Sequence, residues 1–299
     1  MNVRTAPLAH VLALAGCATL PHPWPKEAVC TGALREGAAL DAQAWLSLVL
    51  QGYDPVTRRA TSPALDCSGS QVRWDAPAVL CADPSTARAA LPDRPITDAD
   101  VVVTEVDKAH HLVWITTTRY ASGDALGPVA LVERRGQTLS VEAVGSLRAN
   151  PERAKLGLLR TGNTVVLVAE GERCAGANAS SCERSARVMP LVANRFEPSR
   201  IVNGAGACLG AGWLHLTREE LDKLGGGRER RYRVDASISA GPDGLRLQEL
   251  VTVHDRESKA NAPERLFRRA EGTTVFRVWG SDLVAETPTL WTRLLQTRD

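Results

Sequence analysis

The sequence has little that would indicate a nucleic-acid-binding or disordered protein. Its 36 basic and 34 acidic residues almost cancel, so the chain has no strong overall positive field that would attract a phosphate backbone. Aromatic residues make up only 4% of the 299-residue chain, but hydrophobic residues make up 44%. This apolar fraction is enough to bury a core, so intrinsic disorder is excluded as the main description.

Complete catalytic motifs are also missing. The chain contains neither the G-x-S-x-G motif of serine hydrolases nor the H-E-x-x-H motif of zinc proteases. The glycine-rich segment 204–212 is not a dinucleotide-binding fingerprint, because Leu209 stands where the third glycine would be, and no Lys-Ser or Lys-Thr pair follows. We interpret this segment as a connector held by a disulfide at Cys208, and we predict no cofactor.

The first 16 residues have the layout of a secretory signal peptide. Arg4 precedes an apolar stretch from Ala6 to Ala15, which ends in small residues ahead of Cys17. The stretch is too short to remain as a transmembrane helix, which needs roughly 20 residues. The four residues Leu14, Ala15, Gly16 and Cys17 resemble the lipobox of bacterial lipoprotein precursors.

The resemblance implies that the precursor is cleaved before Cys17, that the cysteine sulfur carries two acyl chains such as palmitate, and that the new amine is often acylated. Two or three chains anchor a protein durably, because each buried methylene contributes about 0.8 kcal/mol and one chain alone is marginal. Ala18 stands where an Asp would retain a lipoprotein in the inner membrane, which favours the outer membrane, facing the periplasm or the cell surface. The proline-containing residues 17–27 would form a short tether.

The number of cysteines supports an oxidising compartment and a special role for Cys17. Seven cysteines leave one unpaired, and lipidation of Cys17 would leave an even six. In the alternative, the signal is cleaved elsewhere and Cys17 forms a disulfide. The six cysteines expected in disulfides are Cys30, Cys67, Cys81, Cys174, Cys182 and Cys208.

Spacing ranks the pairings of these six cysteines without deciding among them. The pairs that it favours are, in order, Cys174 with Cys182 across a polar loop, Cys67 with Cys81, and, by elimination, Cys30 with Cys208. The alternative, in which Cys30 is bonded to Cys67 and Cys81 to Cys208, stays open.

Alternating hydrophobic patterns from Val101 onward predict a mainly β protein. The runs Val101–Val106 and Leu112–Tyr120 are separated by polar turn residues, a hairpin pattern. The further strands predicted are Val129–Glu133, Leu139–Val144, Leu156–Arg160, Thr164–Glu170, Arg187–Val192, Phe196–Val202, Tyr232–Ser239, Leu245–Val253, Arg265–Arg269 and Thr273–Trp279. About ten to twelve strands joined by hairpins indicate an antiparallel sandwich, open barrel or meander.

We predict a single disulfide-braced domain from residue 28 to residue 299, with a sub-boundary near residues 97–100 as a weaker alternative. A propeller is the other alternative for the fold, because some four-strand stretches have the length of a propeller blade. No repeated residue signature supports it.

Three short helices are predicted among the strands. Asp41 can cap a helix over residues 42–51. A capping-box pattern that begins at Thr217 predicts a helix over residues 218–224. The last helix begins at Thr287, and its apolar face is expected to pack on a sheet. That face comprises Leu290, Trp291, Leu294 and Leu295.

Asp107, His110 and His111 are the metal candidates of the sequence. Histidine and carboxylate side chains can bind zinc or copper. However, adjacent histidines rarely point at one ion, and the sequence identifies no third ligand elsewhere. We therefore predict a solvated hairpin turn at these residues and no metal site.

A few other residues invite a functional interpretation. Glu249 shares the apolar face of its strand, so it either points at the core or is released to solvent by a bulge or an edge position. His254 and Asp255 have the chemistry of an acid–base pair, but chance adjacency explains them better. Most Trp side chains are expected in the core, among them Trp45, Trp114, Trp279 and Trp291.

These observations predict a non-enzymatic outer-membrane lipoprotein, held on the membrane through Cys17, whose β-rich domain binds a protein or glycan partner in an envelope assembly. Nucleic acid is not an expected partner. One alternative is an exported enzyme such as a glycan hydrolase, in which the fold would bring two carboxylates to about 5–10 Å in an open cleft. A third interpretation, a lipoprotein effector delivered to other cells, would need a separable C-terminal domain.

Overall fold

The computed structural model describes residues 27–34, 40–74, 81, 89–174, 182–257, 259 and 262–297. Strands dominate this part of the chain, which contains only two α-helices. The first elements are β1 (Cys30–Ala33), α1 (Ala42–Val49), β2 (Leu50–Gln51), β3 (Leu65–Asp66), a 3-10 turn (Asp98–Asp100), β4 (Val101–Glu105), β5 (His110–Ile115), β6 (Thr118–Arg119), β7 (Ala125–Arg135) and β8 (Thr138–Ala149).

The second half of the chain contains the longest strands. Its elements are β9 (Lys155–Thr161), β10 (Thr164–Cys174), β11 (Cys182–Val192), β12 (Arg195–Phe196), β13 (Arg200–Val202), β14 (Cys208–Ala211), β15 (Trp213–Leu224), β16 (Arg228–Gly241), β17 (Gly244–Glu257), β18 (Arg265–Trp279), β19 (Asp282–Val284) and α2 (Leu290–Gln296). The predicted signal peptide and most of the tether lie outside the described residues.

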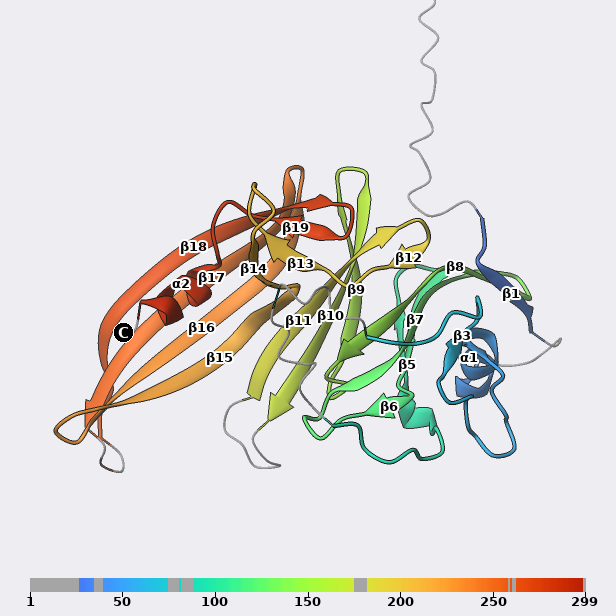
Figure 1. The fold of residues 1–299 in the computed structure, drawn as a ribbon, viewed down its shortest axis with the longest axis horizontal. Helices are drawn as coiled ribbons and strands as arrows, with labels where there is room; N and C mark the ends of the chain where they lie inside the picture. Colours follow the sequence, from blue (N-terminus) through green and yellow to red (C-terminus); the bar gives the residue numbers. More distant parts are fainter. Residues whose placement is uncertain are drawn as a thin grey trace, which may run out of the picture.

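Within the described residues, seventeen strands join in one mostly antiparallel sheet, and β2 and β3 form a separate small ladder. The first part of the large sheet runs β4–β5–β7–β8–β1. The second part runs β9–β10–β11–β15–β16–β17–β18. The short strand β12 follows β11 and pairs in parallel with β8, so it connects the two parts. Figure 1 shows the first part beside α1 and the second part extending away as long, curved strands.

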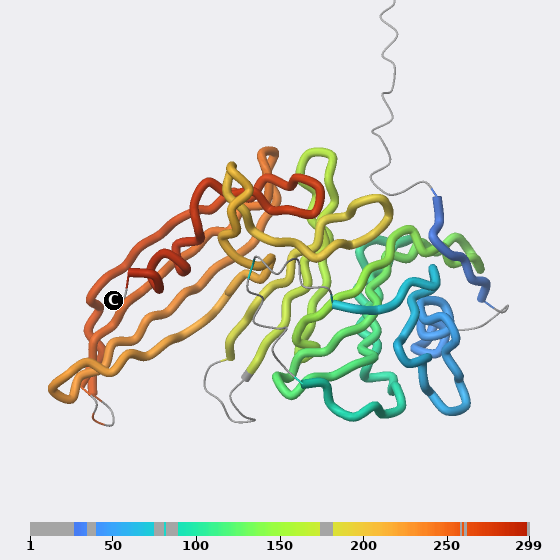
Figure 2. Tube along the Cα trace, in the orientation of Figure 1, coloured from blue at the N-terminus to red at the C-terminus, as the bar shows by residue number. Residues whose placement is uncertain are grey.

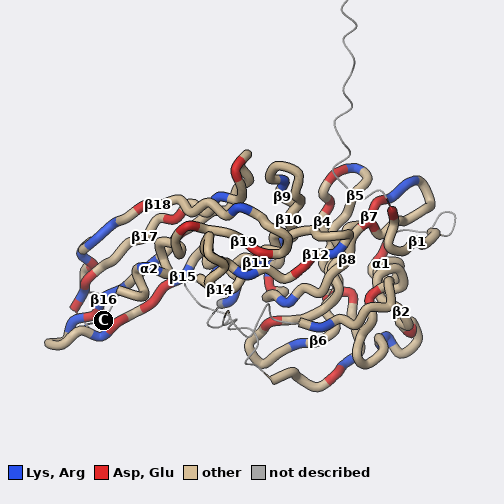
Figure 3. Tube along the Cα trace, turned by 45° about the horizontal axis from the view of Figure 1, so that its top comes forward, with Lys and Arg blue, Asp and Glu red and all other residues tan. Residues whose placement is uncertain are grey.

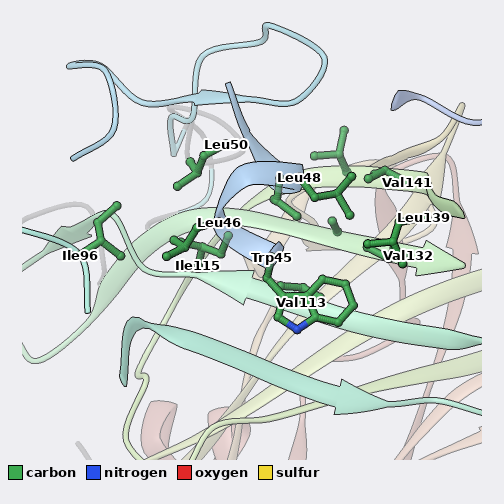
Figure 4. Packing of buried hydrophobic residues seen from close by; sticks show 13 residues of the cluster. Trp45, Leu46, Leu48, Leu50, Ile96, Val113, Ile115, Val132, Leu139 and Val141 are labelled. Carbon is green, nitrogen blue, oxygen red and sulfur yellow. The ribbon is translucent and has the colours of Figure 1, made fainter. Parts of the chain in front are cut away.

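The hydrophobic residues form successive layers along this sheet. Helix α1 covers one face of the first part, where Trp45 and Leu46 pack with Val113, Ile115 and Val132. Figure 4 shows these side chains pointing at one another between the helix and the strands. Burial of a side chain of this size stabilises the fold by about 1.5–3 kcal/mol. A helix of eight residues is marginally stable by itself, so α1 is stabilised mainly by this packing.

The opposite face of the first part packs against β9–β11 as a sandwich. Leu112, Trp114 and Leu131 meet Leu167 and Met189 there, and all five side chains are fully buried. In Figure 2 the chain runs from α1 at one end of the molecule to β18 and α2 at the other, so chain order and spatial order largely agree. Neighbouring elements are therefore mostly joined by hairpins.

The curved strands have two cores of their own. On the other face of β10 and β11, Val166 and Val188 pack with Leu214, Leu245 and Phe276. A further cluster lies under α2, where its apolar face packs on β16 and β17. Its buried members are Tyr232, Val234, Val251, Val253 and Trp291, with Leu290, Leu294 and Leu295 beside them.

The predicted fold class is confirmed, since the protein is mainly β, built from antiparallel hairpins, and combines a sandwich with a meander. The propeller alternative is wrong, because the strands belong to one large sheet instead of separate blades. Helix α1 is confirmed with its predicted cap, since Asp41 Oδ1 accepts a hydrogen bond of 2.9 Å from the Ala44 backbone N–H. Helix α2 begins at Leu290, later than predicted, and packs through the predicted face.

The predicted helix over residues 218–224 is wrong, because these residues belong to β15. Thr217, the expected cap, accepts a hydrogen bond through Oγ1 from the Arg184 backbone N–H and donates one to the Cys182 carbonyl. The ladder with β16 continues from Thr217 to Leu224. A long cross-strand ladder thus outweighs a local capping signal that has no apolar helical face behind it.

The predicted break between the strands Arg265–Arg269 and Thr273–Trp279 is also wrong, because Arg265–Trp279 is one continuous strand. Gly272 instead lies beneath α2, where an added Cβ would be 3.4 Å from Leu290. The glycine marks the close approach of the helix, not a change of chain direction. At the end of the same strand, Trp279 is 80% exposed, so its predicted place in the core is wrong, while Trp45, Trp114 and Trp291 are buried as predicted.

The disulfides follow the alternative pairing. Cys30 is bonded to Cys67 and Cys81 to Cys208, so the pairs Cys67–Cys81 and Cys30–Cys208 are wrong. The physical reason is that β1 docks on β8, which brings Cys30 to the loop after β3, and sequence spacing contains no information about this docking.

The remaining predicted pair lies at the β10–β11 hairpin. Cys182 is disulfide-bonded, and the strand register sets it opposite Cys174. The side chain of Cys174 lies outside the described residues.

Among the described residues, neither α-helix has the length and the apolar character that a membrane-spanning helix needs.

Candidate functional site

Three strands of the first sheet bring a histidine and two glutamates together. His110 begins β5 and stands directly opposite Glu133 of β7. The β7–β8 register shifts between Leu131 and Val132, so that Glu142 is an extra residue on β8. Such a bulge re-aims a side chain, and it lets Glu142 join the other two.

The cluster of His110, Glu133 and Glu142 is buried. Their exposed fractions are 6%, 8% and 5%, and one ligand atom from each residue lies within 4.8 Å of the other two. His110 Nε2 and Glu142 Oε2 are 3.6 Å apart. Two carboxylates and an imidazole in so small a buried volume need a cation or a shared proton between them.

Asp107 holds the imidazole from the other side. Its Oδ1 and Oδ2 lie 2.8 and 2.9 Å from His110 Nδ1. Oδ1 also accepts hydrogen bonds from the backbone N–H groups of Ala109 and His110, at 2.8 and 2.9 Å. The carboxylate therefore keeps the proton on Nδ1, and Nε2 faces the two glutamates.

The two glutamates have different electrostatic surroundings. Glu133 Oε1 accepts a hydrogen bond of 2.7 Å from Arg135 Nε, which lowers the pKa of Glu133. Burial raises the pKa of Glu142 to about 7, and the nearby Glu133 carboxylate adds to this rise while His110 opposes it. Arg135 is 71% exposed, so the cluster lies just beneath the surface at the hairpin ends.

The structure separates the three metal candidates of the sequence. His110 belongs to the buried cluster and Asp107 supports it from outside, so the predicted solvated turn is wrong for His110. His111 points to the other face of the sheet, where its ring centroid lies 5.6 Å from that of Trp45. Sequence reasoning missed Glu133 and Glu142. The signal that could have found them is a single carboxylate within each of two strongly apolar strands.

Glu249 is buried, and its role is structural. It is 4% exposed, and its Oε2 and Oε1 accept hydrogen bonds from the backbone N–H groups of Leu290 and Trp291, at 2.7 and 3.1 Å. The carboxylate thus caps the first turn of α2. Burial raises its pKa, although these two hydrogen bonds oppose the rise.

A cavity of about 130 Å³ lies beside Glu249 and is lined partly by Trp213 and His215. Burial lowers the pKa of His215 to about 4, and its Nε2 lies 2.9 Å from Arg218 Nη1, which donates to the neutral ring. Glu249 and His215 therefore already have protein partners, which weakens the case of this cavity as a ligand site.

The other motifs of the sequence have structural roles. Asp255 accepts two hydrogen bonds from Arg230, at 2.7 and 2.9 Å, while His254 faces Glu264 at 3.5 Å, so the adjacent pair does not act together. In the glycine-rich connector 204–212, Cys208 is bonded to Cys81, as the disulfide prediction for this segment required.

The outer edge of β18 is a second feature that bears on function. β17 pairs along one side of β18, whereas β19 covers only Arg277–Trp279 on the other side. In the described part of the chain, residues 265–276 have no strand partner on that side. Leu266 and Phe267 are 53% and 60% exposed at its start, and the Arg230 guanidinium lies 4.0 Å over the Phe267 ring.

Charged residues surround this open edge. Arg265, Arg268 and Arg269 of β18 are exposed, and Glu271 follows them. Figure 3 shows basic and acidic segments interspersed along the long strands, with no large area of one sign.

Comparison of the chain with protein-family models, with curated proteins and with solved structures finds no match in any of the three.

Proposed function

We propose that the chain is a lipid-anchored protein of the bacterial outer membrane with a binding or structural role in a cell-envelope assembly. The anchor is Cys17, in the segment that resembles a lipobox. The domain behind it serves to hold a partner near the membrane.

The use of cysteine is the observation that carries this proposal. Five cysteines after residue 17 are disulfide-bonded, and the sixth, Cys174, is the cross-strand neighbour of one of them. Disulfides of this kind persist in oxidising compartments. If the six later cysteines pair with one another, the seventh, Cys17, has no disulfide partner. Its sequence context favours lipidation as the modification that it carries.

The open edge of β18 supports a binding role. An unpaired strand edge offers backbone N–H and C=O groups to an added strand. Arg265, Arg268 and Arg269 favour an extended partner segment with acidic side chains. We therefore assign the edge to a protein partner.

The alternatives have less support. A glycan hydrolase needs two carboxylates in a cleft wide enough for a sugar ring, but Glu133 and Glu142 are only 8% and 5% exposed. A delivered effector needs a separable C-terminal domain, but Leu245 and Phe276 share a core with Val166 of β10. The geometry favours one continuous domain that presents a surface.

The test is intact mass and membrane fractionation of the native protein beside Cys17→Ser and Ala18→Ser variants. We expect the native protein to carry acyl mass and to sediment with the outer membrane. Cys17→Ser should lose both properties, because no thiol remains to be acylated. Ala18→Ser, which keeps the cysteine, should behave as the native protein. A native protein without acyl mass in the soluble fraction would contradict the proposal and bring the exported enzyme forward.

A further inference from the structure

We propose that His110, Glu133 and Glu142 bind one divalent transition-metal ion, with Zn²⁺ as the expected choice. The site lies at the end of β5, β7 and β8, far in the chain from the predicted lipid anchor. The inference is independent of the proposed function, because a metal can brace the domain wherever the protein resides.

The donor set fits the chemistry of such an ion. One imidazole and two carboxylates are ligands that Zn²⁺ takes in proteins, with bonds of about 2.0–2.2 Å. Tetrahedral bonds of that length separate neighbouring ligand atoms by roughly 3.3 Å. His110 Nε2 and Glu142 Oε2 are 3.6 Å apart, so this pair is within a few tenths of an ångström of the required spacing.

Glu133 completes the set with a small adjustment. Its Oε1 is held by Arg135, which leaves the other carboxylate oxygen for the ion. All three ligand atoms lie within 4.8 Å of one another. A side-chain rotation that draws Glu133 inward closes the site without a change of strand register.

Glu142 provides an independent indication that something binds here. It is 5% exposed, and its Oε2 accepts no hydrogen bond from any described residue. A buried carboxylate oxygen without a donor is costly, and such atoms call for an ion or another ligand. The atom lies on the same side as His110 Nε2, which is where a metal would be coordinated.

Asp107 supplies the outer support that metal-binding histidines require. Metal ligands of this type usually donate their second ring N–H to a carboxylate, which fixes the tautomer and the ring orientation. Asp107 accepts this hydrogen bond from His110 Nδ1. The imidazole is therefore held with Nε2 ready to coordinate before any ion arrives.

Charge balance and access also fit. Two carboxylates neutralise a doubly charged cation, and the neutral imidazole adds no charge. Asp107 and Arg135, which border the cluster, have side chains that are 49% and 71% exposed. An ion can thus enter from the hairpin ends, even though its ligands are buried.

The first experiment measures metal binding by the full-length protein in detergent, after chelator treatment and dialysis. Zn²⁺, Mn²⁺ and Co²⁺ are titrated separately, bound metal is counted by elemental analysis, and the visible spectrum of the Co²⁺ form reports the ligand geometry. We expect about one equivalent of Zn²⁺ and a rise in Tm of roughly 5–10 °C at saturating Zn²⁺. Failure of all three ions to bind would overturn the proposal.

Matched variants locate the ion. Glu142→Gln and His110→Gln should each weaken Zn²⁺ binding at least about tenfold and abolish the rise in Tm. His111→Gln changes the adjacent histidine on the other face of the sheet and should bind Zn²⁺ as the native protein does. Native-like binding by a folded Glu142→Gln or His110→Gln protein would overturn the site. If either variant fails to fold, the Co²⁺ spectrum of the native protein tests the site instead. A spectrum of nitrogen and oxygen ligation would support the site, whereas the distinct spectrum of thiolate ligation would overturn it.

Discussion

Single carboxylates buried by this fold are each stabilised in a different way. Glu249 caps a helix, Glu142 lies beside His110, and Asp100 is held by cations. Asp100 is 1% exposed and accepts hydrogen bonds from Arg94 and Arg119, at 2.7 Å each. Burial alone would raise the pKa of Asp100, but hydrogen bonds from the Thr97 backbone and from the two arginines hold it well below its usual range.

Replacement of this carboxylate gives a test at the scale of one residue. Asp100→Asn should lower the free energy of unfolding at pH 7 by about 2–4 kcal/mol, because it leaves two arginines around an uncharged group. Asp98→Asn is the control, since Asp98 is 73% exposed and should change stability by less than about 0.5 kcal/mol. Urea denaturation of both variants measures the difference.

The effect of Asp100 should depend on pH in one direction. The pKa of its carboxyl group is lower in the folded protein, so its contribution is present above the unfolded pKa of about 4 and is lost as the pH falls through the folded value. The difference in free energy of unfolding between the native protein and Asp100→Asn should therefore decrease below about pH 4. A gap that widens in acid would show that the ionised carboxylate does not stabilise the fold.

At the scale of elements, features set by local signals could be predicted from the sequence, whereas features set by long-range pairing could not. Asp41, the cap of α1, lies three residues from the Ala44 N–H that donates to it, and this cap could be predicted. The strand nature of residues 218–224 depends on the ladder with β16, so a capping pattern misled the prediction. The position of Glu142 beside His110 and Glu133 depends on a bulge between β7 and β8, and no local sequence pattern predicts this bulge.

The open edge of β18 gives a test at this scale. A photo-crosslinking amino acid at Thr273 on this edge should capture a partner in intact cells. The same amino acid at Ser237 is the matched control, because Ser237 and Thr273 are each paired with Gln248 on one face, but Ser237 lies in β16, away from the edge. We expect at least about fivefold more crosslinked product at Thr273, in line with strand addition at an edge. Equal yields at both positions would rule out the edge as the contact surface.

At the scale of the whole molecule, disulfides connect distant parts of the chain. Cys81 and Cys208 are 127 residues apart, and Cys30 and Cys67 are 37 apart. In the chain-entropy model, a bond that closes a longer loop stabilises more, because it removes more freedom from the unfolded state. The longer bond also joins the first half of the chain to β14, the short strand that precedes the long strand β15.

Removal of each bond tests this ordering. The Cys81→Ser/Cys208→Ser protein should lose about 5 kcal/mol of stability and the Cys30→Ser/Cys67→Ser protein about 4 kcal/mol. Denaturation under non-reducing conditions measures both losses, after peptide mapping has confirmed the native pairs. A peptide map with Cys67 joined to Cys81 would contradict the structure directly.

The sequence by itself determined the mainly β class, most of the hairpins and the cap of α1, because alternation with period two and capping act between residues close in the chain. It also singled out Cys17 and His110. Only the tertiary structure decided the disulfide pairs, the burial of His110 with Glu133 and Glu142, and the exposure of Trp279. The reason is physical, since docking of distant strands, a register shift and the end of a sheet are set by contacts that no short window of residues contains.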